Sequence, residues 1–362
     1  MTIYLDYQAT TPLAPEAFDA MVPLLRDQFA NPHSPHRLGR AAAAQVEVAR
    51  AEILELLPEG GRLLFTSGAT EALNMAIQGA PPGDVVTLAT EHAAVLDTVD
   101  AMGRGGRRIT ILPVGADGLV DLDMAAKAIR PGVALVAAML VNNEIGVIQP
   151  VADLADLSHK AGALFLCDVV QGYGRVPIPA HCDMIAISAH KIYGPKGIGA
   201  LWLRDGVPLT PIIHGGGQEG GLRSGTLSPA LCAGFGIAAR LMRDRAEADR
   251  AHVESLWEAA RALFSHWTLN GSADRRYHGN LNLRRGGVDG ARLLSDCRNV
   301  AFSLGSACAS GSGRPSHVLR ALGLSDAEAR GSVRIGFGRY TTLAELEDAA
   351  GLLNEAAQKW AP

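Results

Sequence analysis

The chain of 362 residues carries a formal net charge of -4, and hydrophobic residues make up 48% of it. This length exceeds the usual size of a single core, so we expect two domains, or a large domain with a smaller one packed on it. The composition excludes a disordered chain, and the weak charge gives no field that would attract nucleic acid or an anionic membrane surface, so neither is expected as a partner.

The N-terminal segment MTIYLDYQATTPLAPEAF has neither the basic nor the apolar region of a signal peptide. No stretch of the chain reaches the roughly 18 uninterrupted apolar residues of a membrane span. We therefore expect a soluble, cytoplasmic protein. Residues 1–12 are too short to fold alone, and we expect them to cross to the smaller domain.

Seven short apolar runs between residues 60 and 205 predict buried strands. They are LLF at 63–65, VVTLA at 85–89, ITIL at 109–112, LVAAML at 135–140, ALFLC at 163–167, MIAI at 184–187 and ALWL at 200–203. Helical patterns at 71–78, 122–129 and 151–161 lie between several of them. This alternation predicts an α/β fold, a mainly parallel seven-stranded sheet with helices on both faces, and ligands in such sheets bind beyond the carboxyl ends of the strands.

The pattern changes after the glycine-rich segment 215–225. A tract rich in Ala, Arg and Glu at 228–265 predicts one connecting helix. Further strands are predicted at 280–283, 300–304 and 333–337, and further helices at 289–297, 316–322 and 343–359. We therefore predict a large domain of residues 13–245 and a smaller α+β domain made of residues 1–12 and 246–362.

Two charged residues follow predicted strands directly. Asp168 comes after ALFLC and Lys191 after MIAISAH, so both should face the crevice at the carboxyl ends of the strands. The other four lysines lie in polar parts of helical patterns or in a glycine-proline turn, where a surface position is expected. A lysine and an acid at one crevice are what a pyridoxal-phosphate enzyme needs, for the Schiff base and for the ring nitrogen. On exposure statistics alone, a surface loop is the favoured interpretation for Lys191 as well, and only the surrounding pattern argues for the crevice.

The run LLFTSGATEALNMAI predicts a strand, a turn and a helix that begins near Ala69 and Thr70. Backbone N–H groups at a helix start bind phosphate, but an ordinary helix cap with Glu71 explains the same residues. Ser188 and His190, beside the lysine, are candidates for further phosphate donors.

Gly215, Gly217 and Gly220 match the spacing of the dinucleotide-binding fingerprint. That motif should join a strand to a helix at the start of a βαβ unit, whereas here more glycines follow and the predicted sheet has ended. We rank an NAD-binding enzyme last. A loop that delivers Arg223 and Thr226 to an anion is the preferred interpretation.

Four of the five cysteines lie in apolar or helical patterns, which predicts core positions for Cys167, Cys182, Cys232 and Cys297. Cys308 differs because it lies in GSACASGSGRPS, a stretch of small residues that can pack little core. A reachable thiol fits that setting, but taken without the rest of the pattern a turn that merely contains a cysteine is the favoured interpretation. No CxxC pair is present, so a reducing compartment is expected, and no metal site is predicted.

Nine motifs are spread in order over nearly the whole chain: YLDYQATTP, TSGATEALN, TEHAAVLD, VNNEIGVIQP, CDVVQ, SAHKIYGPKGIGALW, HGGGQEGGLRSGT, GSACASGSGRPSHVLRALGL and VRIGFGRYTT. In sequence and in order they resemble the class V aminotransferase family of fold type I, and within it the long-loop cysteine desulfurases.

The resemblance implies a role for each matching residue. Lys191 would form the Schiff base, Asp168 would contact the pyridinium nitrogen, and His92 would stack on the ring and move protons. The remaining roles are ring-hydroxyl contacts from Gln171 and Asn143, phosphate contacts from Ala69, Thr70, Ser188 and His190 with Thr226 of a second subunit, and binding of the substrate carboxylate by Arg334 and Asn143.

The resemblance also implies a homodimer that converts L-cysteine to L-alanine. Sulfur would pass to Cys308 as a persulfide and then to an iron–sulfur scaffold or a carrier for tRNA thiolation. A selenocysteine lyase or aminotransferase of the same fold, or a scaffold partner that has lost catalysis, are the alternatives; GSAC at 305–308 favours sulfur acceptance. Two positions depart from the family pattern, Gln8 and Val169, and the branched side chain of Val169 is expected to lie against the cofactor ring.

Overall fold

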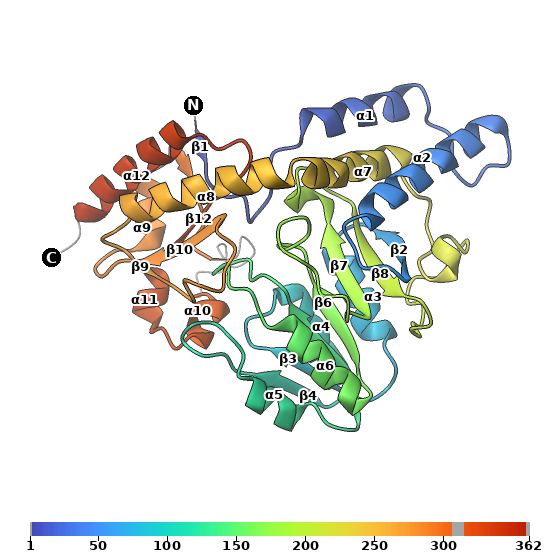
Figure 1. The fold of residues 1–362 in the computed structure, drawn as a ribbon, viewed down its shortest axis with the longest axis horizontal. Coiled ribbons are helices and arrows are strands. Elements are labelled where there is room, and N and C mark those ends of the chain that lie inside the picture. Colours follow the sequence, from blue (N-terminus) through green and yellow to red (C-terminus); the bar gives the residue numbers. More distant parts are fainter. Residues whose placement is uncertain (1, 306–314, 360–362) are drawn as a thin grey trace.

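The computed structural model describes residues 2–305 and 315–359 (Figure 1). Its largest sheet has seven strands in the order β2-β8-β7-β6-β5-β3-β4. They are β2 (Gly61–Thr66), β3 (Asp84–Leu88), β4 (Ile109–Leu112), β5 (Val133–Met139), β6 (Leu164–Asp168), β7 (Met184–Ser188) and β8 (Gly199–Arg204). Strand β8 runs antiparallel to both of its neighbours, β2 and β7, and the other pairs in this sheet are parallel. All seven apolar runs therefore form the predicted, mainly parallel sheet.

Helices cover both faces of this sheet, because alternate strand residues enter different cores. Leu63 and Phe65 belong to one apolar cluster and Leu64 to the other. The first cluster includes residues of α2 (Arg37–Leu54), α5 (Leu122–Ala128), α6 (Val151–Ala161) and α7 (Pro229–Asp244), and the second includes residues of α3 (Ala69–Gly79) and α4 (Ala93–Arg104).

Two smaller sheets form a separate core. Strands β9 (Thr268–Leu269), β10 (Asn280–Arg284) and β12 (Ser332–Gly336) are antiparallel in the order β12-β10-β9, and β1 (Ile3–Tyr4) pairs in parallel with β11 (Val300–Ala301). The core is completed by α8 (Ala246–Leu263), α9 (Gly290–Asp296) and α12 (Leu343–Gln358). The N-terminal segment thus crosses to this part of the chain. The domain boundaries themselves stay a prediction.

The remaining short elements are α1 (Pro15–Arg26), α10 (His317–Ala321), α11 (Asp326–Arg330), η1 (Ala189–Lys191) and η2 (Glu219–Gly221). Within residues 2–305 and 315–359, no helix combines the length and apolarity that crossing a bilayer requires. The segment around Gly215 and Gly217 does not join a strand of the large sheet to a helix of a βαβ unit, so the dinucleotide interpretation finds no support in the fold.

Two predicted elements were wrong in extent. The tract 228–265 is not one helix but α7 and α8, which are interrupted at Arg245 and follow one another along one side of the molecule in Figure 1. Strand β11 ends at Ala301 instead of residue 304, because Ser303 leaves β1 and pairs with Arg334 of β12 through two backbone hydrogen bonds.

Candidate active site

A cavity of about 450 Å³ lies where β5, β6 and β7 end and where α3 and α4 begin. Ten of the residues proposed from the sequence line it together: Ala69, Thr70, His92, Asn143, Asp168, Gln171, Ser188, His190, Lys191 and Arg334. Thr226 is exposed and does not line the cavity, and Cys308 lies outside the described residues. Segments far apart in the sequence therefore converge on one site.

Lys191 ends the short turn η1 that follows β7. Its Nζ donates to the backbone carbonyl oxygens of Gln8 at 2.6 Å and Ala9 at 2.8 Å. Burial, reinforced by the charges of Arg334 and Arg175, lowers the pKa of Lys191 to about 7. An amine that loses its proton near neutral pH can attack an aldehyde carbon.

Asp168 is the last residue of β6 and is buried. Burial raises the pKa of its carboxyl group to about 6, while a hydrogen bond of 2.9 Å from the Val170 N–H acts in the opposite direction. A cationic group bound in the cavity would stabilise the ionised form of this carboxylate.

The expectation for Val169 was wrong. Its side chain is fully buried in the core of the large sheet, and it does not line the cavity. Successive residues of an extended chain point to opposite sides, so Asp168 and Val170 face the cavity while Val169 faces the core. The branched side chain beside a bound ring would be Val170.

His92 caps a helix and also lines the cavity. It is the N-cap residue of α4, and its Nδ1 accepts a hydrogen bond of 3.1 Å from the Ala94 N–H. Burial, followed by the charges of Lys191 and His317, lowers the pKa of His92. In the neutral ring the proton must then be on Nε2, because Nδ1 is the acceptor. The helix cap and the cavity position are therefore compatible.

Among residues 2–305 and 315–359, no side chain caps the start of α3. Gly68 is its N-cap residue, and the capping box considered for Glu71 does not form. Instead the Glu71 carboxylate accepts from the Ser67 N–H at 2.7 Å and from Arg223 Nε at 2.6 Å. Arg223 thus pairs with a carboxylate of its own chain, contrary to the anion-delivering loop that we expected. The helix start that faces the cavity remains suited to a bound anion.

Ser188 and His190 flank this anion site at the end of β7. Ser188 is buried, and the Nδ1 of His190 lies 3.1 Å from the Thr10 hydroxyl oxygen. Burial and the charge of Lys191 lower the pKa of His190 to about 4. The ring is therefore neutral at pH 7 and contributes a hydrogen bond, not a positive charge.

Arg334 enters the cavity from β12 and is 1% exposed. Its guanidinium donates to the Asn143 carbonyl at 3.0 Å and to the Asp6 carboxylate at 2.8 Å. Its Nε has no hydrogen-bond partner among the described residues, and a buried unpaired donor of this kind favours binding of a carboxylate. The sequence analysis missed Asp6, although it lies in the YLDYQATTP motif.

Gln8, the second departure from the family pattern, is 2% exposed, and its Nε2 donates to the Gly279 carbonyl at 2.8 Å. Its side chain packs directly on Gly336, where an added Cβ would lie 1.6 Å from Gln8 Oε1. The backbone of Gln8 also holds Lys191. The close packing of the Gln8 side chain on Gly336 thus helps to fix the backbone oxygen that accepts from Lys191.

Substituting Gly336→Ala should lower the free energy of unfolding by about 1–3 kcal/mol, because the new methyl group must displace the buried Gln8 side chain. Gly351→Ala is the control, since that glycine is exposed in α12 with nothing within 4 Å of an added Cβ. The control should gain about 0.5–1 kcal/mol from helix propensity. Urea denaturation measures both, and equal stability of the two variants would contradict the packing described.

Comparison with known proteins agrees with this geometry. The model of the class-V aminotransferase family matches residues 3–348 of the chain. The chain belongs to the class-V aminotransferase family. It is 43% identical to "Cysteine desulfurase IscS" of Rickettsia bellii over 98% of the chain and 90% of the relative. It is 44% identical to "Cysteine desulfurase, mitochondrial" of Saccharomyces cerevisiae over 99% of the chain and 77% of the relative.

Solved structures show the same fold. The X-ray structure of a NifS-like protein from Rickettsia africae superposes with a TM-score of 0.91 at 30% identity, over 99% of this chain and all of the other. The chain therefore has fold type I of the pyridoxal-phosphate enzymes. The cofactor of the class-V aminotransferase family is pyridoxal 5'-phosphate. The cavity fits this group, since it offers a neutralisable amine at Lys191, a buried acid at Asp168 and an uncapped helix start at α3.

Proposed function

We propose that the chain is a pyridoxal-phosphate-dependent cysteine desulfurase that converts L-cysteine to L-alanine and passes the sulfur on through a persulfide of Cys308. The observation that carries this proposal is the convergence of Lys191, Asp168 and Arg334 on one cavity. It occurs in a chain whose relatives are named cysteine desulfurases at 43–44% identity.

The proposal assigns different tasks to different residues of the cavity. Pyridoxal phosphate, when bound, supplies an electron sink for the charge that develops at the substrate α-carbon. Lys191 would hold the cofactor through its amine and supply the group that moves the α-proton, and Asp168 would keep the ring nitrogen protonated. The start of α3, with Ser188 and His190, would bind the phosphate.

His92, Gln171 and Asn143 complete the proposed contacts. His92 would lie against the cofactor ring and would exchange a proton through Nε2, since Nδ1 accepts from the Ala94 N–H. Gln171 and Asn143 are assigned to the ring hydroxyl. Arg334 binds the carboxylate of the substrate cysteine through the unpartnered Nε, with Asn143 helping from the same side.

Sulfur transfer requires a thiolate close to the substrate. In the proposed step the Cys308 thiolate bonds to the substrate sulfur, the carbon–sulfur bond breaks, and the electron pair left on carbon takes a proton to give alanine. Gly305 and Ser316, described residues on either side of this segment, both approach the buried Glu144. Ser316 Oγ donates to the Glu144 carboxylate, and a Cβ on Gly305 would lie 3.1 Å from that carboxylate. Glu144 adjoins Asn143 of the cavity, which supports delivery of the thiol to this site.

Substituting Cys308→Ala should abolish persulfide formation and lower sulfide release about a hundredfold or more, because the acceptor nucleophile is lost. Cys297→Ala is the control, since that thiol is buried in the smaller core and does not line the cavity. Release of sulfide in the presence of a reductant measures both variants. Sulfide release at the wild-type rate from Cys308→Ala would exclude the persulfide role. The visible absorption of the cofactor should be the same in both variants.

We also propose a homodimer in the cytoplasm. Support comes from large apolar side chains that are exposed on α1, α2 and the segment between them: Phe18, Leu25, Phe29, Leu38 and Val48. A second copy that covers them could also bring Thr226, which does not line the cavity of its own chain, to the partner's phosphate site. Sedimentation that detects only monomers would contradict the proposed homodimer.

An iron–sulfur scaffold or a sulfur carrier for tRNA thiolation is the proposed recipient of the persulfide.

A further inference from the structure

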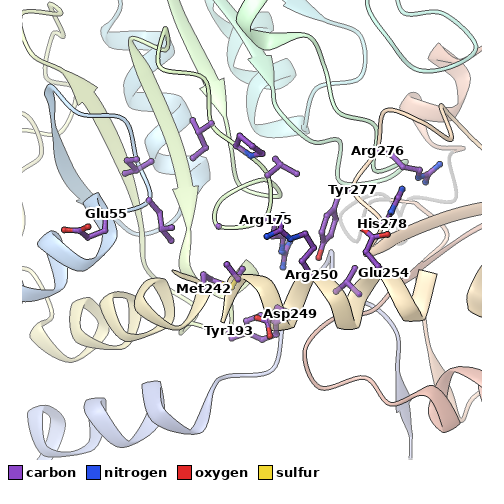
Figure 2. Close-up of a pocket in the computed structure, with 18 of the residues that line it drawn as sticks. Glu55, Arg175, Tyr193, Met242, Asp249, Arg250, Glu254, Arg276, Tyr277 and His278 are labelled. Carbon is purple, nitrogen blue, oxygen red and sulfur yellow. Dashed lines mark hydrogen bonds and ion pairs between the residues drawn. The ribbon is translucent and has the colours of Figure 1, made fainter. Parts of the chain in front are cut away.

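A second cavity, of about 630 Å³, has Arg175, Tyr193 and Tyr277 among its lining residues (Figure 2). Gly174 and Arg175, from the turn after β6, line it together with Tyr193, from the turn after β7. Gln171 and Lys191, from the same two turns, line the first cavity instead. The two cavities therefore share a wall, and that wall includes the backbone of the proposed cofactor lysine.

Arg175 spans this wall. Its guanidinium donates to the Lys191 carbonyl oxygen through Nη2. Through Nη1 it donates to the backbone oxygen of Gln171 at 3.3 Å and to Gln171 Oε1 at 3.4 Å. On its other side it lies over the ring of Tyr277, 5.2 Å from the ring centre, and the two residues are adjacent in Figure 2. One planar side chain thus contacts both turns that carry cavity residues.

The turn after Lys191 needs such support. Tyr193 has a φ of 69°, in the left-handed region that side-chain-bearing residues rarely adopt. Its N–H donates to the Thr11 hydroxyl at 2.7 Å, and its own hydroxyl accepts from the Arg339 N–H at 2.9 Å. Arg175 adds the bond to the Lys191 carbonyl two residues earlier. Strain of this kind persists only where surrounding contacts fix the backbone.

Tyr277 connects this arrangement to the smaller core. It packs against the apolar clusters of both the large sheet and the small sheets, and its N–H donates to the Gly146 carbonyl at 2.8 Å. A shift of the small sheets relative to the large one would therefore reach Arg175 through Tyr277.

We propose that Arg175 is a positioning residue of the cofactor site, which fixes the Lys191 backbone and the Gln171 side chain from the second cavity and places a positive charge behind the lysine. This inference rests on the proposed function, because it requires Lys191 to hold pyridoxal phosphate. Burial, the charge of Arg334 and the charge of Arg175 together lower the pKa of Lys191. The effect of the Arg175 charge on this pKa should therefore be measurable separately from the effect of its hydrogen bonds.

The test compares Arg175→Gln, Arg175→Lys and the control Arg250→Gln. Arg250 lines the same cavity but is exposed. Each full-length variant is freed of cofactor and titrated with pyridoxal phosphate, which gives a dissociation constant from the visible absorption. The pH midpoint of that absorption is then measured in the loaded protein.

Arg175→Gln should raise the dissociation constant about 5- to 30-fold through loss of the charged hydrogen bonds. It should also raise the pH midpoint by about 0.5–1 unit, because a positive charge that disfavours protonation of the lysine nitrogen is gone. Arg175→Lys keeps the charge but not the planar fork, so its midpoint should stay near the wild type while its affinity falls. A purely structural role would lower the unfolding temperature without moving the midpoint.

The inference is overturned if Arg175→Gln matches Arg250→Gln in both the dissociation constant and the midpoint. If the Gln variant does not fold, Arg175→Lys decides alone: reduced affinity with an unchanged midpoint supports the inference, and wild-type affinity overturns it. Failure of the proposed cofactor site has a different signature, because Lys191→Ala would then keep its visible absorption. Failure of the desulfurase activity alone would appear as cysteine consumption without alanine, while the effect of Arg175→Gln on cofactor binding would remain.

Discussion

Lys191→Ala should abolish the visible absorption of the lysine-bound cofactor and lower alanine formation from cysteine about a thousandfold or more. The amine is carried by the turn that follows β7, is buried, and has a pKa lowered to about 7, so a fraction of the lysine is neutral and able to attack the aldehyde at pH 7. Its removal eliminates both the covalent attachment and the base that moves the α-proton. Absorption spectra and an alanine assay measure the two losses separately.

Lys160→Ala is the matched control, because Lys160 is exposed near the end of α6 and does not line the cavity. It should keep both the absorption and the activity. Wild-type alanine formation in Lys191→Ala would remove the basis for placing the cofactor at this lysine, whatever its absorption.

Arg334→Lys should raise the Michaelis constant for cysteine about a hundredfold, because truncating one partner of a buried charged contact costs about 2–5 kcal/mol. A lysine ammonium retains the charge but cannot pair with the Asp6 carboxylate, the Asn143 carbonyl and a substrate carboxylate in one plane. The visible absorption of the cofactor should be retained, since Arg334 is assigned to the substrate.

Arg50→Lys provides the control for Arg334. Arg50 is also largely buried and pairs with the Glu219 carboxylate at 2.8 Å, but it does not line the cavity. Both variants lose a comparable ion pair, so a loss of stability should occur in both. An unchanged Michaelis constant in Arg334→Lys would mean that the substrate carboxylate binds elsewhere.

Much of the large sheet could be predicted from the sequence because its strands are short, apolar and bounded by turns. Buried parallel strands produce continuous apolar runs, and all seven runs became strands of the sheet. No element was predicted over residues 13–59, yet α1 and α2 lie there. Pro23 inside α1 argues against a helix on local grounds, and α1 is held instead by packing on α7.

The break at Arg245 was not visible in the sequence either. Residues 228–265 contain neither a glycine nor a proline at that point, and each half of the tract has its own amphipathic pattern. The two helices pack on different cores, so α7 lies against α1 and α2 while α8 lies against α12. Tertiary packing, not local propensity, ends the first helix.

The site could be predicted only in part. Lys191 and Asp168 stood out because each follows an apolar strand, and Cys167, Cys182, Cys232 and Cys297 are buried as expected. The carbonyl groups of Gln8 and Ala9 that accept from Lys191 carry no pattern, since any residue supplies a backbone oxygen.

The most direct test of the desulfurase proposal is the product ratio with cysteine as the sole amino-acid substrate, together with pyridoxal phosphate and a thiol reductant. The account predicts alanine and sulfide in equal amounts over many turnovers, without any added 2-oxo acid. An aminotransferase of the same fold would need a 2-oxo acid as amino acceptor. Turnover that depends on an added 2-oxo acid, or cysteine consumption without alanine, would contradict the account.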